Sequence, residues 1–243
     1  MTLSTDSGGT VPALDGPTAA LVRQSARITA GSEEEIRAGF AECLAAKVSQ
    51  RWQEELVLQS YLFAGFPRAL NAAREWRRSQ AASGQAPSGE TRGAAGGGQQ
   101  AHAAERRSGQ ALVDGPHEGY ADVFEWRERG EETCAVVYGE FYEKLRGNIR
   151  ALSPALDEWM IVEGYGKVLS RAGLDLGRRE LCIIAACAAG GQDRQLHSHL
   201  HGALNAGVSA EVVRAAIGAL DGVVPHEALS RALLLLARVV GKE

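Results

Sequence analysis

Titratable side chains are densest where two helices are expected to form an antiparallel hairpin closed by Gly190-Gly191. Glu180 lies ten residues before Gly190 (180 to 190), and His199 lies eight residues after Gly191 (191 to 199). At about 1.5 Å per residue, both side chains are roughly 12–15 Å from the turn and therefore level with each other. If both point inward, the carboxylate and the imidazole form a proton-transfer pair. The alternative is an exposed Glu180 at a helix end and a His199 satisfied in the core.

Two further histidines flank His199 in an HxHxH pattern that resembles a metal site. His197 and His201 are four residues apart and share a helix face, whereas His199 is turned by about 200° from His197. Three imidazoles so placed cannot converge on one ion. Either His197 and His201 bind a metal with a third ligand from elsewhere, or they lie at a subunit or solvent surface; we expect the latter and predict no metal.

The elements that position these residues are helices. Apolar residues recur at helical spacing, and no segment alternates as a strand does. Ser32 followed by Glu35 predicts a capping box at a helix start, and Ser153-Pro154 predicts the start of a helix over 155–169. The expected fold class is all-α, built from antiparallel helical hairpins.

An internal repeat accompanies this pattern, because residues 18–49 align with residues 178–209 without gaps at an offset of 160. In the first copy, Ala20 stands where Glu180 stands in the second, and Gly39 stands where His199 stands. The first copy therefore lacks the acid–base pair. The identical positions are Leu21/Leu181, Ala26/Ala186, Gly31/Gly191, Leu44/Leu204, Ala46/Ala206, Val48/Val208 and Ser49/Ser209.

The two copies are separated by a segment rich in Gly, Ala, Ser and Gln, with few large apolar residues. Such a segment cannot bury enough surface to offset the entropy of ordering it. We expect a degenerate unit at 1–78, a flexible linker at 79–119 and a second folded unit at 120–243.

Charge and composition exclude several classes of function. The 243-residue chain has 26 Lys and Arg against 30 Asp and Glu, a net charge of −4, which argues against nucleic acid as a partner. It shows no signal peptide and no apolar stretch near the ~20 residues of a membrane span, so a membrane is not an expected partner either. Without a signal peptide, we expect a cytoplasmic protein. The four cysteines are scattered without a CxxC pair and do not suggest a disulfide framework.

Several motifs, in this order, resemble the carboxymuconolactone decarboxylase family, which includes the alkyl hydroperoxidase D-like proteins. The resemblance covers about 131–220, and part of the first unit is similar to the closing helices of the same domain. The motifs of the second unit are Val137-Tyr138-Gly139, Tyr165-Gly166-Lys167-Val168-Leu169-Ser170-Arg171-Ala172-Gly173-Leu174, Arg179-Glu180-Leu181, Gln195-Leu196-His197-Ser198-His199-Leu200 and Ala203-Leu204-Asn205-Ala206-Gly207-Val208. Those of the first unit are Glu55-Leu56-Val57-Leu58-Gln59, Phe63-Ala64-Gly65-Phe66-Pro67 and Asn71-Ala72.

This resemblance implies tandem helical repeats of the alkyl hydroperoxidase D-like type, assembly into a homo-oligomer (a trimer or hexamer), and chemistry without a cofactor or metal. The peroxidase branch of the family needs a CxxC pair, whose positions match Gln192 and Gln195 here. An amide cannot form the thiolate that attacks a peroxide. Peroxidase activity is therefore disfavoured, and the lone Cys187 is what remains for thiol chemistry.

The leading functional hypothesis is a decarboxylation, or a related lyase or isomerase step, on a small carboxylated substrate. His199 would be the general acid or base, Glu180 would orient it, and Gln195 would donate a hydrogen bond. Arg171 and Tyr165 would bind the substrate. The alternative is a catalytically silent helical binding or structural module, with Arg171 a solvated arginine at a helix end; loss of both cysteines favours it, and retention of Glu180 and His199 disfavours it.

The two units also suggest a composite site. The first unit keeps an aromatic segment, 63–67, whereas no aromatic residue follows Tyr165 in the second. Phe63 and Phe66 would then cover the Glu180–His199 pair and exclude water from it. The alternative is that both rings fill the core of their own unit.

Overall fold

Every regular element in the described parts of the chain, residues 14–84 and 123–241 of a computed structural model, is a helix, as the sequence predicts. The helices are α1 (Gly16–Ala30), α2 (Glu33–Ala45), α3 (Gln50–Ala64), α4 (Phe66–Ala82), α6 (Val123–Tyr138), η1 (Gly139–Phe141), α7 (Tyr142–Leu152), α8 (Pro154–Trp159), η2 (Met160–Leu169), α9 (Leu176–Ala189), α10 (Asp193–Asn205), α11 (Ala210–Gly218) and α12 (His226–Val240). None of the helices in these ranges has the length and apolar content needed to cross a membrane.

The expected helix starts are present. Ser32 and Glu35 form the capping box of α2, in which the Ser32 hydroxyl accepts from the Glu35 N–H and the Glu35 carboxylate accepts from the Ser32 N–H. Ser153 caps α8 by accepting from the N–H of Leu156, and Pro154 occupies the first turn. These side chains satisfy N–H groups that have no partner within the helix.

The helix predicted over 155–169 does end at Leu169, but from Met160 onward it is a π-helix, η2. Its wider turns pack against α6 at a close crossing. A side chain at Gly166 would strike the backbone carbonyl of Trp126, and one at Gly130 would strike that of Ile161. Two glycines thus let η2 and α6 approach, and this approach carries Tyr165 into the core, where it is only 4% exposed.

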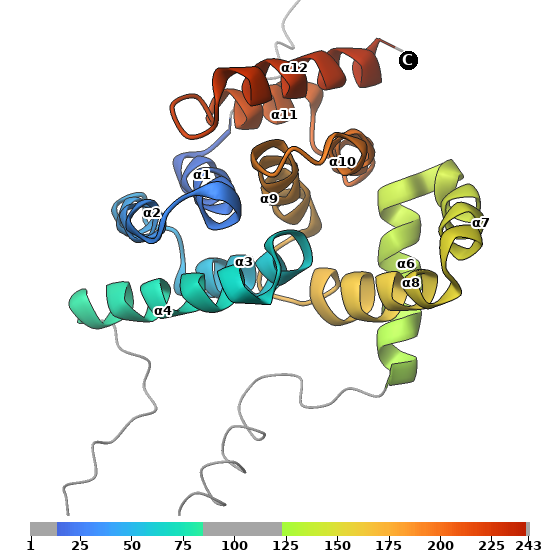
Figure 1. The fold of residues 1–243 in the computed structure, drawn as a ribbon, viewed down its shortest axis with the longest axis horizontal. Helices are drawn as coiled ribbons and strands as arrows, with labels where there is room; N and C mark the ends of the chain where they lie inside the picture. The colour runs from blue at the N-terminus through green and yellow to red at the C-terminus, as the bar shows by residue number, and fades with distance from the viewer. Residues whose placement is uncertain (1–13, 85–122, 242–243) are drawn as a thin grey trace, which may run out of the picture.

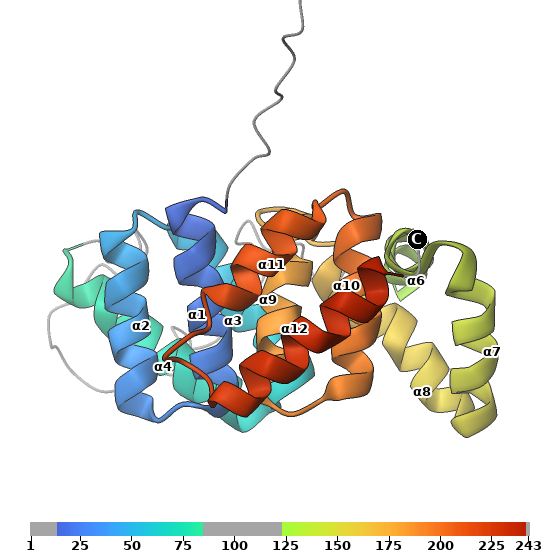
Figure 2. The ribbon, with the colours of Figure 1, turned by 90° about the horizontal axis from the view of Figure 1, so that it is seen from above.

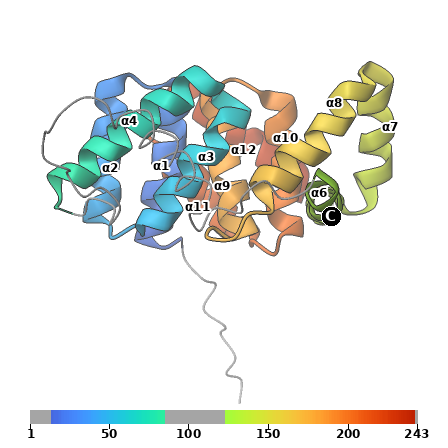
Figure 3. The ribbon, with the colours of Figure 1, turned by 90° about the horizontal axis from the view of Figure 1, so that it is seen from below.

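The helices form three layers (Figure 1). A middle layer contains α2, α1, α9 and α10, with α9 in contact with both α1 and α10. Helices α11 and α12 cover one side of it (Figure 2), and α3 and α4 cover the other (Figure 3). The helices α6, α7 and α8 lie at one end of the molecule, beyond α10.

Helices of the first half of the chain begin and end about 160 residues before corresponding helices of the second half. Asp15 caps α1 and Asp175 caps α9, each by accepting a backbone N–H three residues later. Lys47 (φ 59°) and Gly207 (φ 86°) occupy the same left-handed turn after α2 and α10, and Lys47 is the only residue other than glycine with positive φ in the described ranges. Helices α3 and α4 likewise correspond to α11 and α12. This correspondence supports the proposed duplication.

The two predicted units share one hydrophobic core that contains side chains of α1, α3 and α9. The Ser25 hydroxyl of α1 donates to the Cys182 carbonyl of α9 at 2.6 Å. Helix α4 continues to Ala82, so the first residues of the predicted linker are helical, and the remainder of that linker lies outside the described residues.

Candidate active site

The centre of the site is the buried pair Glu180 and His199, on α9 and α10. Glu180 Oε2 lies 2.7 Å from His199 Nδ1, and the two residues are 0% and 5% exposed. Gly191, with φ of +67°, makes the turn that sets the two helices antiparallel. The level placement expected from the sequence is therefore present, and the exposed Glu180 of the alternative interpretation is not.

The second carboxylate oxygen of Glu180, Oε1, differs from Oε2 in its hydrogen bonding. Oε1 is buried and has no hydrogen-bond partner among the described residues. A buried carboxylate oxygen without a partner is costly, and in folded proteins such atoms concentrate where a ligand or water binds. Oε1 is thus the atom of the pair whose hydrogen-bonding capacity is not used by the described residues.

Four side chains surround this carboxylate closely enough to feel its charge: Cys134, Tyr138, Tyr165 and Cys187. Burial raises the pKa of Tyr138 to about 12, and burial holds the pKa of Tyr165 well above its usual value. Both phenols are therefore neutral at ordinary pH and serve as hydrogen-bond donors or acceptors only. Tyr165, predicted as a substrate contact, is buried within the range of the Glu180 charge.

The cover of the site comes from the first half of the chain. The ring of Phe63, in α3, meets the His199 ring edge-on with centroids 5.7 Å apart. Gln192 fixes this contact, because its Nε2 donates to the Phe63 carbonyl at 3.3 Å and its Oε1 lies 3.6 Å from Cys187 Sγ. The composite arrangement expected from the sequence is thus present for Phe63. Phe66 instead stacks on Tyr61 and is 63% exposed.

The structure does not place Gln195 where it could donate a hydrogen bond in the site, and it does not leave Arg171 free to bind a substrate carboxylate. Gln195 is exposed on α10, one turn before His199. Arg171 points its guanidinium at Glu55 of α3, with Nε–Oε2 at 3.1 Å and Nη2–Oε1 at 3.2 Å. A protein carboxylate thus occupies the bidentate fork that was expected to hold a substrate carboxylate.

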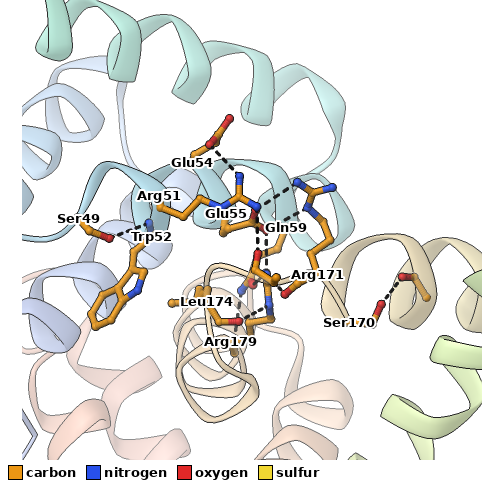
Figure 4. A network of polar contacts seen from close by, with 12 residues as sticks. Ser49, Arg51, Trp52, Glu54, Glu55, Gln59, Ser170, Arg171, Leu174 and Arg179 are labelled. Carbon is orange, nitrogen blue, oxygen red and sulfur yellow. Dashed lines mark hydrogen bonds and ion pairs between the residues drawn. The ribbon is translucent and has the colours of Figure 1, made fainter. Parts of the chain in front are cut away.

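Glu55 is the hub of a buried charge cluster between α3 and α9 (Figure 4). Besides Arg171, it binds Arg179 Nη2 at 2.8 Å and Arg51 Nη2 at 2.9 Å, and both Glu55 and Arg179 are 0% exposed. Burial alone would raise the pKa of Glu55, but hydrogen bonds and charge from Arg171 and Arg179 outweigh burial, so this pKa is lowered. Gln59 completes the cluster by accepting from Arg179 Nη1 at 3.2 Å. The cluster joins the two halves of the chain directly before Glu180.

The other two histidines form no metal site in the described ranges. The rings of His197 and His201 meet edge-on with centroids 5.0 Å apart. No group of three or more His, Cys, Asp or Glu side chains within residues 14–84 and 123–241 is arranged to hold an ion. Both histidines line a cavity that neither Glu180 nor His199 lines.

Gly202 is a residue of the site that the sequence reasoning missed. A Cβ atom at this position would lie 2.7 Å from Glu180 Oε2 and 2.7 Å from Val137 Cγ1. Glycine is unfavourable inside a helix by roughly 0.5–1 kcal/mol relative to alanine, so its presence within α10 was the available signal. Its absent side chain is what gives the Glu180 carboxylate its place beside His199.

We predict that Gly202→Ala lowers the free energy of unfolding by about 1–3 kcal/mol, because the added methyl group overpacks the space of the carboxylate. Gly147→Ala is the matched control, since Gly147 lies inside α7 with no atom within 4 Å of the added Cβ. We expect that control to be neutral or to stabilise the protein. Urea denaturation measures both, and equal effects in the two variants would contradict the assignment of Gly202 to the site.

We predict that the thiols of the folded protein are unreactive. All four cysteines are free and buried, and burial, assisted by the charge of Glu180, raises the pKa of Cys187 to about 12. The thiolate is the nucleophile, so alkylation near pH 8 should be slow until denaturant is added, and peroxide should not be reduced with a dithiol. Fast labelling of Cys187 in the folded protein, detected by peptide mass, would restore thiol chemistry as a hypothesis.

These observations define a class: an all-helical protein with a buried carboxylate–imidazole pair across a helical hairpin and with glutamines in place of a thiol pair. Residues 154–237, from α8 into α12, match the carboxymuconolactone decarboxylase family. The matched segment contains Tyr165, Arg171, Glu180 and His199. Among curated proteins, none matches the chain.

Proposed function

We propose that the protein performs cofactor-free acid–base chemistry, a decarboxylation or a related lyase or isomerase step, on a small carboxylated substrate. The observation that carries the proposal is the 2.7 Å contact between Glu180 Oε2 and His199 Nδ1 inside a buried site. The match of residues 154–237 to the carboxymuconolactone decarboxylase family supports the same class of reaction.

In this proposal His199 Nε2 exchanges protons with the substrate, because Nδ1 is engaged by Glu180. The substrate's bond to its carboxylate breaks, and CO₂ leaves. The electron pair left on carbon is delocalised into a conjugated carbonyl group of the substrate. His199 then donates the Nε2 proton to that carbon and regains a proton from water. Glu180 stabilises the imidazolium form and fixes the ring.

The contacts support the predicted auxiliary roles to different degrees. Tyr165 is buried beside Glu180 and, as a neutral phenol, is suited to hydrogen-bond a substrate oxygen. Arg171 would have to exchange Glu55 for a substrate carboxylate. Gln195 is exposed, and the amide nearer to the cover of the site is Gln192.

A screen for CO₂ release tests the proposal. The full chain is incubated in D₂O with a panel of β-keto acids and unsaturated lactone carboxylates, and products are read by proton NMR. We expect CO₂ release, with incorporation of one deuterium at the carbon that lost the carboxylate, to be faster than in an enzyme-free control, and we expect no such acceleration with the His199→Gln variant. Turnover that survives this substitution would refute the role of His199.

Two observations favour the second candidate function, a catalytically silent binding or structural module. His199 is only 5% exposed, with Phe63 against its ring, and the fork of Arg171 is neutralised by Glu55. A substrate that reaches the His199 ring from the side of α3 therefore requires Phe63 to move. Absence of turnover across the panel, together with a retained 2.7 Å pair, would favour this candidate.

We also propose that the protein is a cytoplasmic homo-oligomer, a trimer or hexamer. Three large apolar side chains on α7 and α8 are exposed: Leu152 at 79%, Leu156 at 53% and Trp159 at 60%. Exposed apolar groups so close together are typical of association surfaces. Light scattering that gives a monomer of 25.8 kDa would contradict the oligomer.

A further inference from the structure

A cavity of about 560 Å³ lies between the α6–η1–α7 corner and the helices α10 and α12. Its volume is in the range of small-molecule sites. Its lining is mixed, with polar groups from Tyr138, Glu140, Lys144, Asn148, His197, Ser198, His201 and Asn205, and apolar groups from Val137, Phe141, Leu145 and Val239.

The polar part of this cavity suits an anion. The Lys144 ammonium has no ion-pair partner within the described residues, although Glu140 lies one turn before it in the same lining. His197 and His201, edge to edge on α10, add imidazole groups on the opposite wall. Asn205 donates from Nδ2 to the Val137 carbonyl at 2.9 Å, which fixes its amide.

The apolar part suits a flat or unsaturated hydrocarbon body. Phe141 is 51% exposed although it lines the cavity, and Leu145 and Val239 complete that wall. Covering an exposed phenyl ring of this kind is favourable, because it removes apolar surface from water. A ligand that pairs a carboxylate with a small apolar body satisfies both walls.

One side chain separates this cavity from the buried pair. Tyr138 lines the cavity, and its hydroxyl interacts with the hydroxyls of Tyr165 and Ser198. Tyr165 in turn lies in the field of Glu180. The cavity therefore lies next to side chains that surround Glu180, and it contains a lysine without an ion-pair partner, whereas the fork of Arg171 is held by Glu55.

We propose that this cavity binds a small carboxylate with an apolar body, with its charge at Lys144 and His197 and its apolar body on Phe141, Leu145 and Val239. That the ligand is the substrate rests on the proposed function, whereas its binding does not. Lys144 and His197 are then specificity-determining residues, and Tyr138 is the partition between the recognition site and the reacting pair.

Isothermal titration calorimetry with benzoate, and with benzamide as the neutral isostere, tests the proposal on the full chain. We expect saturable binding of benzoate and at least ~10-fold weaker binding of benzamide, as loss of one charge-assisted contact predicts. Lys144→Met should weaken benzoate binding by about 10-fold. The matched control is Lys47→Met, since Lys47 is exposed in the α2–α3 turn and should have no effect.

Histidine variants give a second, independent comparison. His197→Gln should weaken benzoate binding, whereas His226→Gln, at the exposed start of α12, should not. His199→Gln should keep benzoate binding, so loss of turnover in that variant separates the reaction from recognition. The proposal is overturned if benzoate does not saturate up to about 10 mM, if benzamide binds equally well, or if Lys144→Met and Lys47→Met behave alike.

Discussion

Replacing Glu55 by glutamine is expected to lower the free energy of unfolding by about 3–5 kcal/mol. The carboxylate is 0% exposed and binds Arg171, Arg179 and Arg51. Arg179 is itself 0% exposed, so the substitution leaves a buried guanidinium without its counter-charge. Breaking a buried ion pair on one side is far more costly than removing a surface pair, because the remaining charge stays desolvated.

Glu54→Gln is the matched control for this variant. Glu54 is the preceding residue on α3, loses the same charge, and makes a single ion pair with the partly exposed Arg51 at 3.3 Å. We expect a change below about 1 kcal/mol. Urea denaturation at pH 7 measures both variants, and similar effects for Glu54 and Glu55 would show that the cluster does not hold the two halves together.

The stability lost in the Glu55→Gln variant should depend on pH, and the lowered pKa of Glu55 determines the direction. The pKa of Glu55 is lowered in the folded protein, so its contribution is present above the pKa of an unfolded glutamate, about 4.3, and is lost as pH falls through the folded value. The difference in stability between the wild-type chain and Glu55→Gln should therefore shrink below about pH 4. A difference that grows in acid would contradict this sign.

Much of the fold and the central pair follow from local sequence pattern. Helical periodicity and the Gly190-Gly191 turn placed Glu180 and His199 level on a hairpin, and the structure has them 2.7 Å apart. Such features depend on residues within one or two turns of each other, where spacing determines geometry. Caps also recur at the offset of 160, at Asp15 and Asp175, because a cap depends only on its own turn.

What the sequence did not show depends on contacts between distant segments. Arg171 and Glu55 are 116 residues apart, and nothing in either local pattern indicates that one will neutralise the other. The apolar pattern of residues 160–169 does not distinguish a π-helix from an α-helix. The π-helical turns of η2 nevertheless determine how Tyr165 and Gly166 face α6. Gln195 was assigned by its position in a motif, whereas exposure is set by how α10 packs in the tertiary fold.

Removing either member of the buried pair should abolish most of the proposed activity. For proton transfer by a positioned side chain the expected loss is 10²–10⁴-fold in kcat, roughly 3–5.5 kcal/mol of transition-state stabilisation. His199→Gln removes the proton-exchanging atom Nε2. Glu180→Gln keeps an amide of the same shape beside Nδ1, but it removes the charge that stabilises the imidazolium.

The design of these variants separates chemistry from folding. Glu180→Gln replaces a buried carboxylate, whose Oε1 has no partner, by a neutral group, so the fold should tolerate it. Gln195→Ala is the control on the same helix, because Gln195 is exposed and should change kcat by less than about 2-fold. Circular dichroism and urea denaturation of each variant establish that the fold is kept.

The division between kcat and KM then decides what the pair does. If Glu180 and His199 act on the reacting atoms, both substitutions lower kcat while KM changes little, since the interaction is made only in the transition state. If the pair only holds α9 and α10 together, the loss should instead follow the loss of stability, and Gly202→Ala, which crowds Glu180 Oε2, should reduce activity as much as Glu180→Gln does. A fold-preserving Glu180→Gln variant with wild-type kcat would leave the pair as a structural hydrogen bond, and the cavity beside Tyr138 would then be a binding site without a reaction behind it.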